Sequence, residues 1–202
     1  MKLLVLCTAF CAVIFSANAQ SVTLMTFESF TFADKFETQY GYGKIQDGFQ
    51  WGAGLEFEVQ PNTAVELIYQ RMDADFYYND YYYGDDYSGQ IGLNYILLGA
   101  TQYQPFSDAV SGFGTFDMGA GFTSPGDNDF GSACKFTIGG RLGLRIAPSD
   151  KISIRLHAQI LSPIQWIGGG FYFGTGGGGA SVSSGSTIWQ FNLGGSVNYR
   201  IK

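Results

Sequence analysis

The chain has 202 residues and a formal net charge of −6; only 14% of its residues are charged, while 46% are hydrophobic and 17% aromatic. A typical soluble domain has about 25% charged residues, so this composition does not easily cover a surface that faces water on all sides. The length suits a single domain, and the negative charge argues against nucleic acid as a partner.

The first 20 residues have the pattern of a secretory signal peptide. Lys2 gives a short positive beginning, an apolar run extends from Leu3 to Phe15, and Ala17-Asn18-Ala19 is a small-x-small cleavage signal. The run is too short for a membrane anchor. We therefore predict a signal peptide over residues 1–19 and a mature chain that begins at Gln20 and forms one domain over 20–202.

Removal of this segment changes the cysteine count. Cys7 and Cys11 leave with it, so Cys134 is the single cysteine of the mature chain and an intrachain disulfide is excluded. The mature chain also has no run of about 18–20 apolar residues, which a membrane helix requires. A chain this apolar can still lie in a membrane as a closed barrel, whose strands alternate apolar and polar residues.

Alternation of this kind recurs along the mature chain and is clearest near its end. Trp189, Phe191 and Leu193 share one face of the segment 187–201, and Gln190 and Asn192 share the other. A period of two indicates strands and not helices. We expect eight strands, at 22–33, 49–60, 63–76, 88–103, 112–123, 133–147, 151–162 and 187–201.

The predicted fold class is therefore an all-β, eight-stranded antiparallel up-and-down transmembrane β-barrel. Each predicted strand is long enough to cross a bilayer when tilted. The connections alternate between short turns and longer segments, the latter at about 34–48, 77–87, 124–132 and 163–186. Outer-membrane barrels have short periplasmic turns and long extracellular loops. This pattern predicts that both termini lie in the periplasm and that the location is the outer membrane.

The segment FYYNDYYYGDDY, residues 76–87, combines seven aromatic residues with three acidic ones. Tyrosine rings suit the lipid headgroup level, and aspartates suit water. We therefore expect the tip of an extracellular loop here. Its aspartates do not match the spacing of a known calcium loop. The candidate interaction residues are Tyr77, Tyr78, Asp80, Tyr81, Tyr82, Tyr83, Asp85, Asp86 and Tyr87.

The chain resembles the small outer-membrane β-barrel proteins of Bacteroidota-type bacteria, which are relatives in shape of the OmpA, OmpX and OmpW-type barrels. The resemblance rests on the signal peptide, on FADKFETQYGYGKIQDGFQWGAGLEFEV (32–59), on TAVELIYQR (63–71) and on NLGGSVNYRIK (192–202). It implies outer-membrane lipid as the environment, assembly by the barrel-assembly machinery, and other outer-membrane proteins as candidate partners. Such barrels usually end in an aromatic residue, whereas this chain ends in Arg200-Ile201-Lys202.

The predicted registers point a set of ionisable side chains into the lumen. Side chains just fill an eight-stranded barrel, and charges in so confined a space require partners. We therefore expect arginine–carboxylate networks that plug the barrel, with a narrow pore as the alternative. The predicted network consists of Glu56, Glu58, Glu66, Asp117, Arg141, Arg145, Arg155, His157 and Arg200.

Three classes of function are compatible with such a barrel. The first is a structural or interaction protein that displays loops, alone or as a subunit of a larger outer-membrane assembly. The second is a narrow channel or transporter for small solutes. The third, a lipid-modifying enzyme, is disfavoured because no serine stands two residues from His157 on its face, and we interpret His157 as a packed, hydrogen-bonded interior residue.

The sequence predicts no cofactor and no metal site. The glycine-rich stretch 168–186 lacks the GK[ST] ending of a phosphate loop and a preceding parallel strand. We interpret it as a flexible extracellular loop. The mature chain has neither a cysteine pair nor a cluster of metal-ligating residues.

Overall fold

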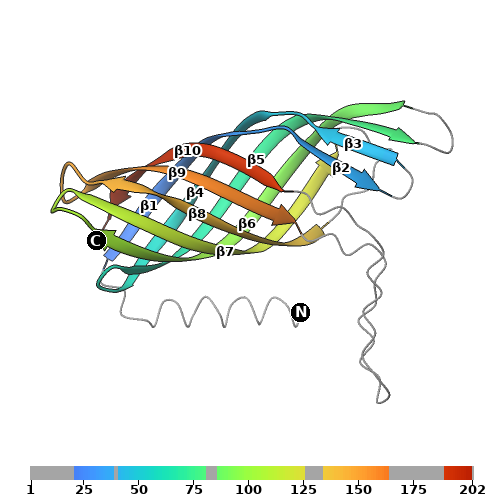
Figure 1. Ribbon diagram of the computed structural model, residues 1–202. Helices are drawn as coiled ribbons and strands as arrows, with labels where there is room; N and C mark the ends of the chain where they lie inside the picture. Colours follow the sequence, from blue (N-terminus) through green and yellow to red (C-terminus); the bar gives the residue numbers. More distant parts are fainter. Residues whose placement is uncertain (1–20, 39–40, 81–85, 126–133, 164–188, 202) are drawn as a thin grey trace, which may run out of the picture.

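The computed structural model describes residues 21–38, 41–80, 86–125, 134–163 and 189–201, and every regular element in them is a β-strand (Figure 1). The expected alternation accounts for this, since inward and outward side chains differ in kind along each strand. The strands are β1 (Ser21–Thr31), β2 (Asp34–Thr38), β3 (Gly41–Ile45), β4 (Gly48–Gln60), β5 (Thr63–Asp80), β6 (Asp86–Pro105), β7 (Val110–Pro125), β8 (Cys134–Ile146), β9 (Ile152–Pro163) and β10 (Gln190–Arg200).

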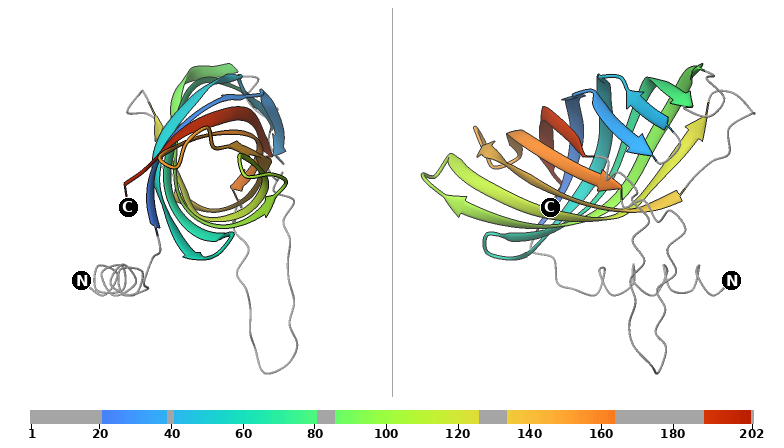
Figure 2. Two further views of the ribbon diagram at one scale, coloured as in Figure 1. Left: turned by 90° about the vertical axis from the view of Figure 1, so that its left-hand side faces the viewer. Right: turned by 45° about the vertical axis from the view of Figure 1, so that its right-hand side comes forward.

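Eight of these strands close into an antiparallel barrel, as predicted. The strands β4 to β10 pair in chain order, and β1 closes the ring by pairing with both β10 and β4. The left view of Figure 2 shows this ring end-on. Following the paired residues once around the barrel from Ser21 leads back to β1 at Thr31, ten residues further along. Such a stagger requires the strands to tilt against the barrel axis.

The two ends of the barrel differ. Short turns at 61–62, 106–109 and 147–151 join strands at one end, which we call the short-turn end. Asn62 has a positive φ of 64°, which asparagine tolerates in tight turns. Both ends of the described chain lie there, because Ile201 N–H donates to Val22 O at 2.8 Å and Ser21 pairs with Glu58. The opposite end is called the long-loop end.

The predicted long connection at 34–48 joins the barrel strands β1 and β4, but it contains regular structure that was not expected, the antiparallel hairpin of β2 and β3. The strand β3 pairs with the upper part of β5, directly beyond the part that pairs with β4. The hairpin thus continues the lines of β1 and β4 past the long-loop end of the barrel (Figure 1). The Asp34 carboxylate accepts a hydrogen bond from Trp189 N–H at 2.8 Å, which fixes the hairpin to the start of β10.

The predicted loop at 77–87 is also shorter than expected. The strand β5 extends to Asp80 and β6 begins at Asp86, with pairs as far as Asn79 and Asp86. Only residues 81–85 of this segment lie outside the described residues, as do 126–133 and 164–188 of the other two predicted loops. The tyrosine-rich segment therefore belongs largely to a two-stranded extension of the barrel wall.

The outer and inner faces of the barrel differ in character. The outer face is predominantly apolar, and its exposed side chains include Leu24, Phe30, Phe49, Trp51, Leu67, Ile96, Phe116, Met118, Phe136, Leu142, Leu144, Ile154, Leu156, Ile160, Phe191, Leu193 and Val197. In the described part of the chain, no helix is long and apolar enough to cross a membrane.

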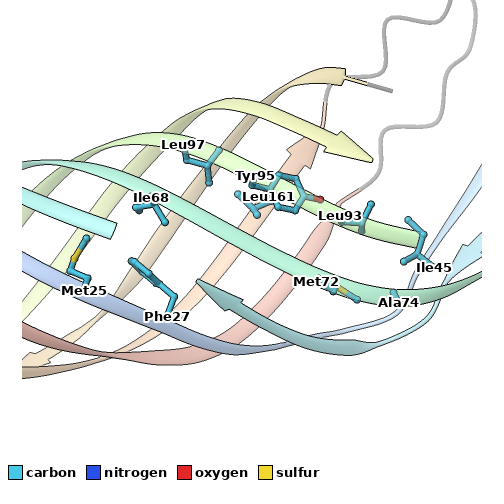
Figure 3. Packing of buried hydrophobic residues seen from close by; sticks show 10 residues of the cluster. All are labelled: Met25, Phe27, Ile45, Ile68, Met72, Ala74, Leu93, Tyr95, Leu97 and Leu161. Atoms are coloured by element: carbon cyan, nitrogen blue, oxygen red, sulfur yellow. The ribbon is translucent and has the colours of Figure 1, made fainter. Parts of the chain in front are cut away.

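The lumen contains more apolar side chains than the sequence suggested. A cluster of buried hydrophobic residues occupies its middle and its long-loop end (Figure 3). Its most buried members have 0–2% of their surface exposed and include Met25, Phe27, Ile68, Met72, Leu97 and Leu161. The lumen is therefore layered, with an apolar part beside the polar and charged part that the sequence predicted.

Candidate functional site: the charged layer of the lumen

The charged layer is built by five strands. Glu56 on β4, Glu66 on β5, Asp117 on β7, Arg141 on β8 and Arg155 on β9 all point inward, because each has the lumen-facing parity of its strand. Four of them have 0–1% of their surface exposed, and Glu56 has 6%. The structure thus brings together five of the nine predicted lumen residues.

Arg141 joins two carboxylates from different strands. Its Nη2 donates to Glu66 Oε2 at 2.6 Å, and its Nε and Nη2 donate to the two oxygens of Asp117 at 2.9 Å each. The guanidinium also lies 5.3 Å from the centre of the Phe27 ring. Two-point contact of this kind fixes the orientation of the guanidinium in addition to balancing its charge.

Arg155 makes the second bridge across the lumen. Its Nη1 donates to Glu66 Oε1 at 2.9 Å, and its Nη2 contacts Glu56 and the hydroxyl of Tyr103. Tyr103 O–H in turn donates to Glu56 Oε2 at 2.5 Å. The guanidinium lies 5.3 Å from the centres of both the Tyr103 and Phe113 rings. The aromatic rings thus lie against parts of the guanidinium that the carboxylates do not contact.

Glu66 is the centre of the layer, because both arginines contact it. Thr101 Oγ1 lies 2.6 Å from Glu66 Oε1 and 2.7 Å from Thr115 Oγ1. Hydroxyl donors matter here since three carboxylates face two guanidiniums, and a buried carboxylate oxygen needs a donor. We did not predict Thr101, Tyr103 or Thr115 from the sequence. The inward parity of β6 and β7 is the available signal, but parity alone does not distinguish a hydroxyl that contacts a carboxylate from one that does not.

Arg145, Arg200 and Glu58 lie apart from this layer, at the short-turn end. Arg200 and Glu58 are separated by 3.8 Å and are each about a third exposed, at 39% and 31% of the side chain. Arg145 departs from the expected pairing: its guanidinium lies 5.1 Å from the centre of the Tyr103 ring, and it forms no ion pair with the described residues. These side chains line a cavity of about 190 Å³ that opens at the barrel mouth.

His157 packs against the edge of Phe27, with ring centres 6.0 Å apart and planes at 68°. The hydrogen bond expected at its ring is not found at Nε2, which is buried without a partner among the described residues. The interpretation as a packed interior residue agrees with this position, and the expected hydrogen bond is absent at Nε2.

A layer of amide side chains lies on the long-loop side of the charged layer. Gln70 and Gln159 contact each other across the lumen at 3.3–3.4 Å. Asn192 Nδ2 donates to Gln159 Oε1 at 3.1 Å and to Gln50 Oε1 at 2.7 Å. Because neutral amides donate and accept, this layer cross-links four strands without adding charge.

The predicted interaction loop is described only in part. Tyr77 and Tyr78 lie in β5, and Tyr87 and Asp86 lie in β6. Tyr78 pairs with Tyr87 across the strands. Tyr81, Tyr82, Tyr83 and Asp85 lie outside the described residues. Nowhere in the described part of the chain do three metal-ligating side chains of the His, Cys, Asp and Glu types gather.

The side chains of the charged layer are buried in the lumen. Glu66 and Asp117 have no exposed surface and Arg141 and Arg155 have 1%. An ion that crossed the layer would have to separate paired charges from one another. The arrangement is thus suited to hold strands together.

Comparisons with known proteins agree with the fold. No family model and no curated protein matches the sequence. Among solved structures, Neisserial surface protein A has a TM-score of 0.57 at 11% identity, covering 87% of this chain and 96% of its own. The outer membrane protein OprG from Pseudomonas aeruginosa has a TM-score of 0.55 at 12% identity, covering 90% and 96%. The fold is therefore that of the small outer-membrane β-barrels.

Proposed function

We propose that this chain is an integral outer-membrane protein whose barrel is plugged by its own side chains. What carries the proposal is the combination of an apolar outer face with a buried network of ion pairs across the lumen. A β-barrel satisfies its backbone hydrogen bonds within the wall and presents apolar side chains to lipid. The likeness in fold to outer-membrane barrels supports the same location.

The role that suits a plugged barrel is structural or interactive. Without an open lumen, the protein can act through its outer wall and through the segments at the long-loop end. We propose that the tyrosine- and aspartate-rich segment and the glycine-rich stretch are displayed outside the cell, that the protein works alone or as a subunit of a larger outer-membrane assembly, and that it is not an enzyme. His157 packs against Phe27 and its Nε2 makes no hydrogen bond with the described residues, so it is not held against a nucleophile as a general base would be, which supports the last part.

The proposal includes a route to the membrane. Residues 1–19 direct export, the barrel-assembly machinery inserts the mature chain, and both termini remain in the periplasm. The position of Ser21 and Ile201 at the short-turn end supports this orientation.

Membrane fractionation tests the location. We expect the full-length protein in the outer-membrane fraction, with the mature chain beginning at Gln20 by mass spectrometry. A folded barrel should also migrate differently on a gel before and after boiling. Recovery in the soluble fraction, with no such shift, would contradict the proposal.

A liposome-swelling assay separates the plugged barrel from the channel. Vesicles that contain the wild-type protein should swell in small sugars and amino acids no faster than empty vesicles, because the charged layer leaves no aqueous path. Swelling that depends on solute size would instead support the channel.

A further inference from the structure

An acidic side chain faces outward from the apolar wall of the barrel. Glu28 lies on the outer face of β1 together with Leu24, Thr26 and Phe30, while Phe27 and Ser29 beside it point into the lumen. Its side chain is exposed and has neither an ion pair nor a hydrogen bond with the described residues. The barrel wall thus presents an unpartnered carboxylate to its surroundings.

Glu28 lies on the membrane side of a row of aromatic rings. Phe30 follows it on the same face, Phe32 packs edge-on against Phe30 at 5.4 Å, and Phe32 stacks on Phe191 at 5.5 Å. Aromatic rows mark the boundary between hydrocarbon and headgroups in membrane barrels. An ionisable side chain inside that boundary is destabilising without a partner and commonly marks a functional contact.

The strand register places Glu28 in a row with an aromatic and a basic side chain. Glu28 pairs with Trp51 of β4, and Trp51 pairs with Arg71 of β5. Trp51 is 47% exposed on the outer face. The Arg71 side chain is 34% exposed and is held by Asp73 and Asn94, with its Nη2 2.6 Å from Asp73 Oδ1. Three adjacent strands thus present an acid, a tryptophan and a base, in that order.

We propose that the outer wall of β1, β4 and β5, centred on Trp51, is an interface between two copies of this chain in the membrane. A two-fold axis along the membrane normal reverses the order of the row in the second copy. Glu28 of each copy then lies on the same side of the axis as Arg71 of the other, and the two Trp51 side chains meet at the centre. This self-complementarity is what a symmetric dimer requires. The inference rests on the proposed membrane location.

The surroundings of Glu28 allow a close approach. Thr26 and Ala53 are register partners on the outer face beside it, and Gly195 of β10 lies opposite Glu28 itself. Small side chains let neighbouring walls meet within a membrane, where packing drives association. Tryptophan and arginine are also the residue types that contribute most at interface centres.

Cysteine crosslinking in native outer membranes tests the interface. In a Cys134→Ser background, Ala53→Cys places a thiol beside the proposed axis. The matched control is Ala158→Cys, an alanine on β9 away from the proposed interface. We expect mild oxidation to give a crosslinked dimer of this chain at position 53 and only monomer at position 158. Equal crosslinking at both positions, a crosslink to a different protein, or no crosslink at position 53 in a folded barrel would overturn the inference.

Charge variants test the pairing itself. The charge-neutral Glu28→Gln should weaken dimer association in detergent by about thirtyfold or more, as expected for loss of one partner of a desolvated charge pair. Copies with Glu28→Arg and copies with Arg71→Glu should each be monomeric alone and should dimerise when mixed, because the mixture restores attraction at both contacts. Dimerisation that is unaffected by these changes, or no recovery on mixing, would contradict the proposed row.

Failure of the proposed interface can be distinguished from failure of the proposed membrane location. A barrel that shows the heat-dependent gel shift and fractionates with the outer membrane, yet gives no dimer, refutes the interface and leaves the location intact. A chain that is not in the membrane refutes the location.

Discussion

Glu66 and Glu58 show how burial determines the contribution of a charged side chain to the stability of this barrel. Glu66 is fully buried and contacts two guanidiniums and the Thr101 hydroxyl. Glu58 lies at the mouth, about a third exposed, and is 3.8 Å from Arg200. Water screens the second pair and not the first, so exposed pairs contribute about 0–1 kcal/mol, whereas loss of one partner from a buried pair costs about 3–5 kcal/mol.

Substitution of these two residues should therefore differ in effect. Glu66→Gln removes the shared partner of Arg141 and Arg155, and we expect the free energy of unfolding to fall by about 3–5 kcal/mol. Glu58→Gln should lower it by less than about 1 kcal/mol. Urea titration of the folded barrel in lipid vesicles measures both, and equal losses would show that Glu66 is not central to the layer.

Gly143 and Gly140, both on β8, differ in how much space surrounds them. A Cβ at Gly143 would lie 2.0 Å from Leu156 O and 2.9 Å from the Phe113 ring, while at Gly140 its nearest neighbour would be Thr115 O at 3.7 Å. We expect Gly143→Ala to lower the free energy of unfolding by about 1–3 kcal/mol. Gly140→Ala should be close to neutral. The same urea titration checks this, and a tolerant Gly143 would mean that the wall can widen there.

At the scale of the element, β9 shows why most of the barrel could be predicted from the sequence. Its residues alternate from Ile152 to Leu161, with Ile154, Leu156 and Ile160 outside and Arg155 and Gln159 inside. Such alternation fixes the face of each side chain. The hairpin of β2 and β3 escaped prediction because glycine, lysine and aspartate in 34–48 resemble a loop. It is stabilised by pairing with β5, a partner that local pattern does not reveal.

The charged layer was predictable to a similar extent. Inward parity identified Glu66, Arg141 and Arg155, because ionisable residues at lumen positions are few. Parity could not distinguish Arg155 from Arg145, which lie on adjacent strands with the same orientation and pair directly in the register. Depth along the tilted barrel separates them, and depth depends on the stagger of all eight strands.

The outer face of β9 allows a test of depth. Leu156 lies near the middle of the strand and Ile152 at its short-turn end, and both point outward, with 56% and 44% exposed. Leu156→Arg should cost about 2–4 kcal/mol in a bilayer, and Ile152→Arg about 0–1 kcal/mol. Folding titrations into vesicles measure the two values. A larger loss at Ile152 would mean that the apolar band is centred elsewhere.

At the scale of the whole molecule, the two ends of the barrel should meet different compartments. We expect chymotrypsin to cut intact cells within the tyrosines at 81–83, since β5 and β6, which flank this segment in the sequence, end at the long-loop end that we place outside the cell. Trypsin should reach Lys151, which is exposed in a short turn, only after the outer membrane is permeabilised. Immunoblotting of the fragments reads both results. Cleavage at Lys151 on intact cells would reverse the orientation.

We propose that paired charges from five strands close the lumen, and single-channel recording in planar bilayers is the sharpest test of this closure. Wild-type protein and Arg155→Ala are measured side by side. We expect no steady conductance for the wild type, because Glu66, Asp117, Arg141 and Arg155 are buried against one another. We expect transient openings for Arg155→Ala, because this change removes a partner of both Glu56 and Glu66. A steady, large current through the wild-type barrel would show that the lumen is open.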